Sequence, residues 1–225
     1  MAFSAQKAVR AGVDGFARRW QSVLLASLAY LVPTEIVFGI LDVDRGWADS
    51  IDLLSDGAAT AAITVGSALA WVAASRAYLG DSATQAISWA ARRALAIVIL
   101  TVVTCTAFLL GLALLVIPGL IALTRLSLAW TAYSDGASSW SEALRRSNSL
   151  VRGHTWRMFV LIVLLSVTYL VIDFIAWRAF GAVTDSDLVG FIAAAAAGSI
   201  TLPLQASVLF SAYDQLRSTE ERLPA

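Results

Sequence analysis

The chain has 225 residues, of which 59% are hydrophobic and only 14% are charged, whereas soluble domains devote roughly a quarter of their residues to charge. Its 16 basic and 16 acidic residues cancel, so no basic domain is present and we expect no nucleic-acid partner. A single cysteine, Cys105, excludes an intramolecular disulfide framework and a cysteine-based metal cluster. The composition therefore indicates a membrane protein.

The first 19 residues form an amphipathic pattern. Apolar side chains recur at Val9, Val13, Phe16 and Trp20, and basic residues occupy other positions on the helical wheel. This spacing predicts an interfacial helix over residues 1–19. The segment lacks a compact apolar run with a small-residue cleavage site, so we expect no removable signal peptide.

Six apolar runs follow, bounded by charged residues. A helix needs about 20 apolar residues to cross the hydrocarbon core, and helices satisfy their own backbone polar groups there. Pro118 and Gly119 divide the third run from the fourth, and Pro203 predicts a kink in the sixth. We predict an all-α polytopic bundle over residues 20–215, followed by a cytoplasmic tail over 216–225, with spans at residues 20–41, 57–79, 94–117, 119–133, 156–177 and 188–210. Whether the third and fourth runs fully cross the bilayer stays open at this point.

Basic residues separate to one side of this six-span arrangement. Only Arg45 and Arg178 fall on the side opposite the N-terminus, and that side instead collects aspartates. Because basic residues favour the cytoplasmic side, the pattern predicts a bacterial inner-membrane protein with both termini in the cytoplasm.

A second surface helix is predicted over residues 138–152. Ser139 and Glu142 have the spacing of a capping box. The helix carries three arginines, which could bind anionic lipid headgroups or simply solvate a loop helix: Arg145, Arg146 and Arg152.

Residues 70–165 also carry a recognisable series of short motifs. They include a glycine-bounded loop ending at Gly80, the proline-glycine turn, Asp135-Gly136, and EALRRSNSLVRGHTWRMF. In this order they resemble the membrane-domain family named after the membrane region of glycerophosphoryl diester phosphodiesterases, together with related bacterial membrane proteins of unknown function. The resemblance implies a fold. It does not imply phosphodiesterase activity, because no soluble catalytic domain fits between the spans.

Ionisable residues inside the predicted spans are candidates for chemistry. Glu35 follows Pro33 in the first span, and Asp173 lies at a similar depth in the fifth, so the two could share an outward-opening cavity. A desolvated carboxyl could act as an acid or proton relay, or could simply be paired with Arg178 or a hydroxyl. Arg125, near the inner end of the fourth span, could bind substrate, snorkel or pair with a carboxylate.

The acidic outer loop offers a second group of candidates. Asp42 and Asp44 could protonate a prenyl chain, or the loop could be acidic simply because basic residues are kept on the inner side. Mg²⁺ would be expected only if the substrate were a diphosphate. We predict no resident metal. An aromatic pocket that could steady a carbocation, with Arg178 beside it, would comprise Trp47, Tyr169 and Trp177.

Three functions remain open from the sequence. The first is a membrane protein that binds a lipid-like amphiphile or scaffolds a membrane complex. The second is a small intramembrane enzyme acting on a prenyl or lipid substrate, with Glu35, Asp42, Asp44 or Asp173 as its acid. The third is transport of ions or small solutes, for which the sequence shows no inverted repeat.

Overall fold

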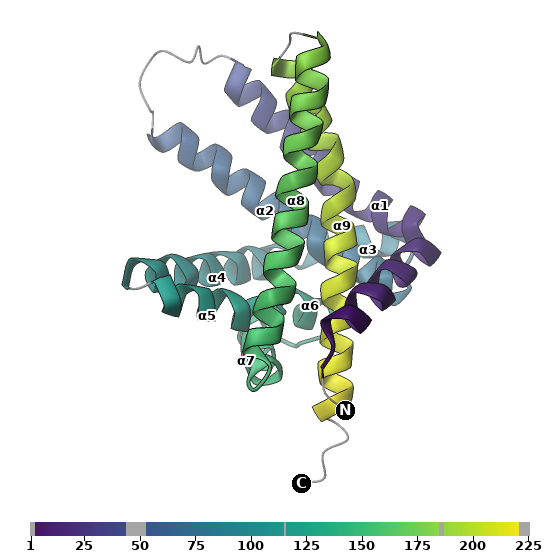
Figure 1. Ribbon diagram of the computed structural model, residues 1–225, viewed down its shortest axis with the longest axis vertical. Coiled ribbons are helices and arrows are strands. Elements are labelled where there is room, and N and C mark those ends of the chain that lie inside the picture. Colours follow the sequence, from purple (N-terminus) through teal and green to yellow (C-terminus); the bar gives the residue numbers. More distant parts are fainter. Residues whose placement is uncertain (1–2, 44–52, 115, 185–186, 221–225) are drawn as a thin grey trace.

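A computed structural model describes residues 3–43, 53–114, 116–184 and 187–220, and every regular element within them is a helix (Figure 1). The all-helical prediction is confirmed. The elements are α1 (Ala5–Val43), α2 (Leu53–Leu79), α3 (Ala83–Arg92), α4 (Ala94–Leu114), α5 (Val116–Leu126), α6 (Ala129–Ser134), α7 (Trp140–Val151), α8 (Thr155–Thr184) and α9 (Asp187–Glu220).

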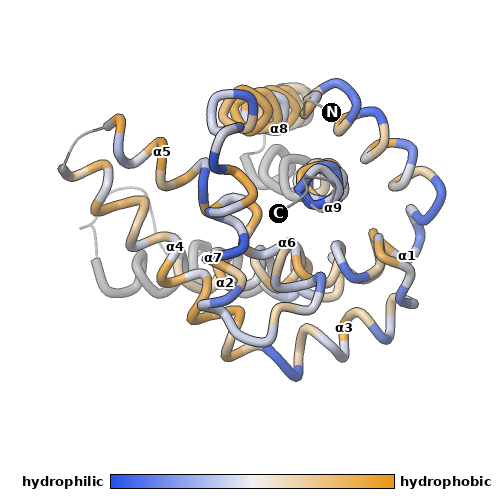
Figure 2. The backbone as a smooth tube through the Cα atoms, turned by 90° about the horizontal axis from the view of Figure 1, so that it is seen from below, coloured by the Kyte–Doolittle hydropathy of each residue, from blue (hydrophilic) through white to orange (hydrophobic). Residues whose placement is uncertain are grey.

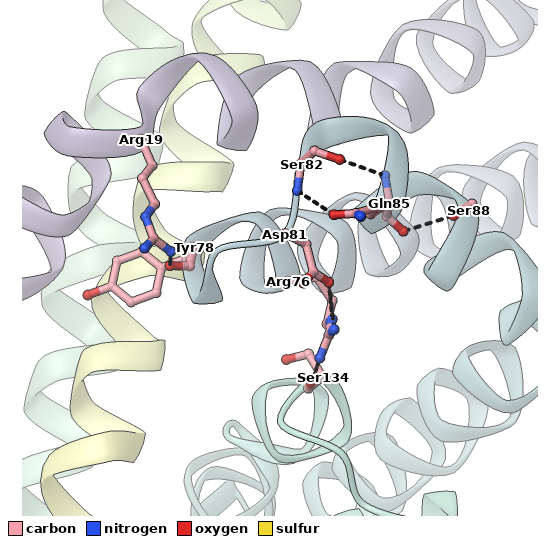
Figure 3. A network of polar contacts seen from close by, with 8 residues as sticks. All are labelled: Arg19, Arg76, Tyr78, Asp81, Ser82, Gln85, Ser88 and Ser134. Atoms are coloured by element: carbon pink, nitrogen blue, oxygen red, sulfur yellow. Dashed lines mark hydrogen bonds and ion pairs between the residues drawn. The ribbon is translucent and has the colours of Figure 1, made fainter.

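Helix α1 bends where the amphipathic pattern ends. Arg19 has non-helical backbone angles, φ −130° and ψ 21°, so the amphipathic part of the helix takes a different direction from the apolar part. The Arg19 guanidinium donates a hydrogen bond of 2.7 Å to the carbonyl oxygen of Tyr78 at the end of α2 (Figure 3). The bend coincides with the predicted boundary between residues 19 and 20.

The core lies where α1, α2 and α9 pack together, and it is built largely of small residues. Ala8, Ala73 and Ala206 are fully buried there. A Cβ atom added at Gly12 would lie only 2.4 Å from the Cα of Val208, so α1 and α9 touch backbone to backbone at this point. A glycine at this position has no side chain to keep the two helices apart, which is how small residues let helices approach closely.

Within the residues that the structure describes, three helical segments are long and apolar enough to cross a membrane, judged by length and composition: Ala61–Leu79, Ala94–Ala113 and Thr155–Ala176. In the apolar window of α8 only 11% is buried inside the protein. Its uncovered surface consists of side chains such as Val160, Leu164, Val167 and Leu170. The described part of the chain is thus compatible with a membrane protein, as the composition predicts.

The region after α4 differs in detail from the predicted third and fourth spans. Helix α4 ends at Leu114, and Pro118 lies inside the first turn of α5, where a missing N–H is tolerated. The predicted helix over 119–133 is divided into α5 and α6 at Ser127 and Leu128. Leu128 has φ −89° and ψ 4°, and the Ser127 hydroxyl donates to the Thr124 carbonyl oxygen at 2.8 Å. Such side-chain bonds to the preceding turn bend helices.

Helix α3 occupies a stretch for which the apolar pattern predicts only a connection between spans. Its N-cap, Ser82, accepts a hydrogen bond from the Gln85 backbone N–H, and the Gln85 side chain accepts one from the Ser82 N–H (Figure 3). Helix α7 falls within the predicted 138–152 segment. Ser139 caps it by accepting from the Glu142 N–H at 3.2 Å.

Candidate functional site: a polar cluster at the end of α6

The carboxylate of Asp135, directly after α6, is the centre of the densest polar cluster among the described residues. Its side chain is only 13% exposed. One oxygen, Oδ2, accepts from the Tyr213 hydroxyl at 2.8 Å and the Arg217 guanidinium at 2.9 Å, and Arg146 Nη2 lies 3.3 Å away. Gly136 follows with φ +107°, the left-handed conformation that favours glycine and lets the chain turn away from α6. The cluster joins α6 to α7 and α9.

Tyr213 is the buried member of this group. Its side chain lies under the Arg146 guanidinium, which is 5.4 Å from the ring centroid, and it packs against Phe210. Burial, reinforced by the hydrogen bond to Asp135, raises the pKa of the Tyr213 hydroxyl well above its ordinary value. The hydroxyl is therefore a fixed donor at neutral pH.

A second set of polar contacts reaches Ser134, the last residue of α6, which directly precedes Asp135. Arg76, at the end of α2, binds Asp81 Oδ2 through Nε at 2.7 Å and Nη2 at 2.6 Å. Its Nη1 donates to the Ser134 carbonyl oxygen at 3.2 Å (Figure 3). The guanidiniums of Arg76 and Arg93 lie 5.1 Å and 4.3 Å from the Trp89 ring centroid. These contacts tie α2 and α3 to the last turn of α6.

The cluster orients guanidiniums and does not have the form of an acid–base site. The three groups around the Asp135 carboxylate, a tyrosine hydroxyl and two guanidiniums, all approach the same oxygen. Asp135 therefore has its charge compensated locally. What the arrangement can do chemically is hold the guanidiniums of Arg146 and Arg217 in defined positions at one end of the protein, where guanidiniums can contact anions.

The three arginines predicted to meet lipid headgroups are not equivalent. Arg146 turns inward to Asp135 and Tyr213. Arg145 and Arg152 are exposed, and neither has an ion-pair partner among the described residues. The structure thus leaves two of the three available to solvent.

Arg125 lies at the end of α5, half-buried. Its Nε is buried and has no hydrogen-bond partner among the described groups. Its backbone carbonyl oxygen accepts from the Ser147 hydroxyl of α7 at 2.7 Å. That bond fixes the end of α5 against α7.

Glu142 completes the N-terminus of α7. Its carboxylate accepts hydrogen bonds from the Ser138 hydroxyl and from the Ser138 backbone N–H at 2.8 Å. These bonds, with a smaller contribution from Arg146 and Arg145, lower the pKa of Glu142 below its ordinary value. In the predicted capping box, the Glu142 side chain accepts a hydrogen bond from the backbone N–H of the N-cap, Ser139. In the structure it accepts from the backbone N–H of the preceding residue, Ser138, instead.

The residues predicted for intramembrane chemistry are only partly described. Asp44 and Trp47 lie outside the described residues, and the side chains of Glu35, Asp42 and Trp177 lie outside the described side chains. The proposed meeting of Glu35 with Asp173 and the complete aromatic pocket therefore stay predictions.

Two of the remaining candidates lie one turn apart on α8. Tyr169 and Asp173 are both half-buried, and the Tyr169 hydroxyl comes within 3.5 Å of a Cβ built at Gly198 of α9. Arg178, further along the same helix, is exposed. Within the described parts of the chain, no three His, Cys, Asp or Glu side chains lie together in a way that could hold a metal ion.

Sequence reasoning did not identify the Asp135 cluster. In the sequence, Asp135 is singled out only as part of the family-like motif, and Tyr213 and Arg217 follow the predicted span over residues 188–210. The available signal was a tyrosine and an arginine four residues apart, on one side of a helix, in an otherwise apolar chain. That spacing does not indicate that Tyr213 bonds a carboxylate that lies 78 residues earlier in the chain.

Comparison with known proteins gives no relative: no protein-family model, curated protein or solved structure matches the chain.

Proposed function

We propose that the chain is an integral membrane protein whose arginine-rich end holds the anionic headgroup of a lipid or lipid-like amphiphile. This end comprises the C-terminus of α3, helix α7 and the start of α8. The apolar helices next to it would contact the acyl chains. The membrane domain over residues 20–215, built from six apolar runs of which the third and fourth need not cross the bilayer fully, is part of the proposal, as is the glycerophosphoryl diester phosphodiesterase membrane-domain resemblance.

The observation that carries the proposal is the position of exposed arginines directly before exposed apolar helices. Arg92 and Arg93 precede α4, where Leu95 is 75% exposed. Arg152 precedes α8, where Trp156 is 73% exposed and stacks on Phe159 at 5.5 Å. Figure 2 shows the change along the chain, from the mixed blue, white and orange of α3 and α7 to α4 and α8, which are mostly orange. Arginine and tryptophan at the ends of apolar helices are typical of the headgroup region.

Exposed arginines that have no nearby carboxylate in the described part of the chain support an anionic partner. Arg92, Arg145 and Arg152 are exposed, and none has a carboxylate within ion-pair distance among the described residues. A basic side chain near an anionic membrane surface contributes about 1 kcal/mol. The positive-inside tendency supports placing this end on the cytoplasmic side.

The test is lipid retention measured by native mass spectrometry of the full chain, extracted gently from membranes or from mixed phosphatidylglycerol and phosphatidylethanolamine. We compare the parent with Arg145→Gln/Arg152→Gln. Loss of two surface contacts of about 1 kcal/mol each corresponds to a roughly thirty-fold weaker affinity for phosphatidylglycerol. Phosphatidylethanolamine binding should not change.

The matched control is Arg145→Lys/Arg152→Lys, which keeps both charges and removes only the planar guanidinium fork. It should retain most of the anionic lipid. Equal retention of phosphatidylglycerol by the parent and the glutamine variant would contradict the proposal.

A further inference from the structure

The hairpin formed by α4 and α5 runs across the long helices of the protein. In Figure 1, α8 and α9 run along the long axis, and α4 and α5 project sideways from it. Figure 2 looks along α9 and shows α4 and α5 lengthwise, extending away from the bundle. The two views agree, so the hairpin is not parallel to α8.

The hairpin is apolar on all sides and mostly uncovered. Residues 94–124 contain no charged side chain. Large apolar side chains are exposed from its middle to its tip: Val102, Leu109, Leu110, Ile117 and Ile121. A helix that is apolar all round is stable only when buried in protein or in lipid, and the described protein leaves this one open. Lipid hydrocarbon is the partner that fits this surface best, because the same acyl chains would also cover the exposed apolar surface of α8.

The second arm of the hairpin is too short to cross a bilayer. Helix α5 has 11 residues, so it is about 16 Å long, whereas the hydrocarbon core is about 30 Å thick. The two arms touch each other near the tip, because a Cβ at Gly111 of α4 would come within 2.6 Å of the Gly119 Cα of α5.

Both arms of the hairpin begin at the arginine-rich end. Arg93 directly precedes α4, and Arg125 is in the last turn of α5. The Ser147 bond to the Arg125 carbonyl oxygen holds that arm against α7. The two arms thus leave and re-enter the protein at the same level.

We propose that the α4–α5 hairpin lies within a single leaflet, the one on the side of the arginine-rich end, with acyl chains of that leaflet around it, and does not reach the opposite surface. The inference rests on the proposed embedding of α8 in the membrane, but it does not require the arginines to bind headgroups.

The test is the depth of nitroxide spin labels in liposomes, from their relative accessibility to oxygen and to a water-soluble nickel complex. Single cysteines replace Val102, Leu109 and Ile117 in the full-length Cys105→Ala chain. All three positions are exposed, so the labels should not disturb packing. The three depths should be similar, and Ile117→Cys should not react with an impermeant maleimide on either side of the membrane.

The control series lies on α8, at Val160, Val167 and Ile175, which are also exposed. Its depth should pass through a maximum at Val167, and the spread along the hairpin should be smaller than the change between Val160 and Val167. A depth maximum within the hairpin series, with Ile117→Cys emerging to water on the far side, would overturn the leaflet placement alone. An α8 series that is water-accessible throughout would instead overturn the membrane embedding, and the leaflet placement with it.

Discussion

Replacement of Asp135 by asparagine removes the charge at the centre of the polar cluster and keeps its shape. The carbonyl oxygen of the introduced amide could still accept from the Tyr213 hydroxyl, which lies 2.8 Å from the carboxylate in the parent. Arg146 and Arg217 would lose their anionic partner. The variant therefore separates the contribution of charge from the contribution of the buried hydroxyl.

The expected loss of stability depends on how far the two arginine side chains are exposed to solvent. A hydrogen bond to a charged group contributes about 1.5–3 kcal/mol when shielded, but the Arg217 side chain is 41% exposed and Arg146 is 30% exposed. Solvent screening reduces each exposed pair to about 1 kcal/mol or less. We expect Asp135→Asn, which loses both pairs, to lower the free energy of unfolding by about 1–2 kcal/mol. Asp135→Ala also leaves the Tyr213 hydroxyl buried without an acceptor, so the loss should rise to about 4 kcal/mol.

The assay is reversible unfolding of the full chain in mixed micelles, followed by circular dichroism. Arg145→Gln is the control, because Arg145 is exposed on the same helix as Arg146 and has no ion-pair partner among the described residues. It should change the free energy by less than about 0.5 kcal/mol. Stability of Asp135→Asn equal to that of the parent, or a loss no larger than that of Arg145→Gln, would refute the role of the cluster in holding α6, α7 and α9 together.

The close contact of α1 with α9 predicts that Gly12→Ala destabilises the chain by about 1–3 kcal/mol, because the new methyl group would overlap the Val208 backbone. Gly198→Ala, whose methyl group would meet only ordinary contacts, should be tolerated in the same unfolding assay. The raised pKa of Tyr213 means that the folded state holds this proton more tightly than the unfolded state. Its contribution is complete below about pH 10, the unfolded value, and is lost as pH rises beyond it; a pH series should show a steeper alkaline loss in the parent than in Tyr213→Phe. The lowered pKa of Glu142 acts in the opposite direction, since its contribution is present above about pH 4.5 and is lost as pH falls; Glu142→Gln should flatten the acid side of the stability profile.

The helices themselves were accessible from the sequence because apolar runs of sufficient length have few alternatives. The bend at Arg19 follows the point where amphipathic spacing gives way to a continuous apolar run. The start of α7 at Trp140 follows from the capping spacing of Ser139 and Glu142. Both are local signals, carried by neighbouring residues.

Other features of the fold depend on capping, side-chain hydrogen bonds and tertiary packing, which hydropathy does not reveal. Helix α3 has the reciprocal capping pair Ser82 and Gln85, but it is short, and its polar residues resemble those of a connecting loop. The break between α5 and α6 at Ser127 lies within a run that is apolar enough to continue as one helix. The crosswise direction of the α4–α5 hairpin depends on packing against other helices, which no single run specifies.

The Asp135 cluster was the least predictable part of the site. Its partners come from α7 and from the end of α9, and Arg217 lies 82 residues further along the chain than Asp135. Charge counting placed Arg146 and Arg217 among the cytoplasmic arginines and could not separate inward from outward side chains. That distinction needs the tertiary structure, because it depends on which arginines meet a carboxylate.

The sidedness of α7 is the most direct test of the account. A cysteine at the exposed Asn148, introduced into Cys105→Ala, is treated with a membrane-impermeant maleimide in intact bacteria and in inside-out membrane vesicles. We predict labelling in the inside-out vesicles and none in intact cells. Labelling from outside intact cells would contradict the cytoplasmic position of the arginine-rich end. Recovery of the chain in the water-soluble fraction instead of the membranes would contradict membrane insertion.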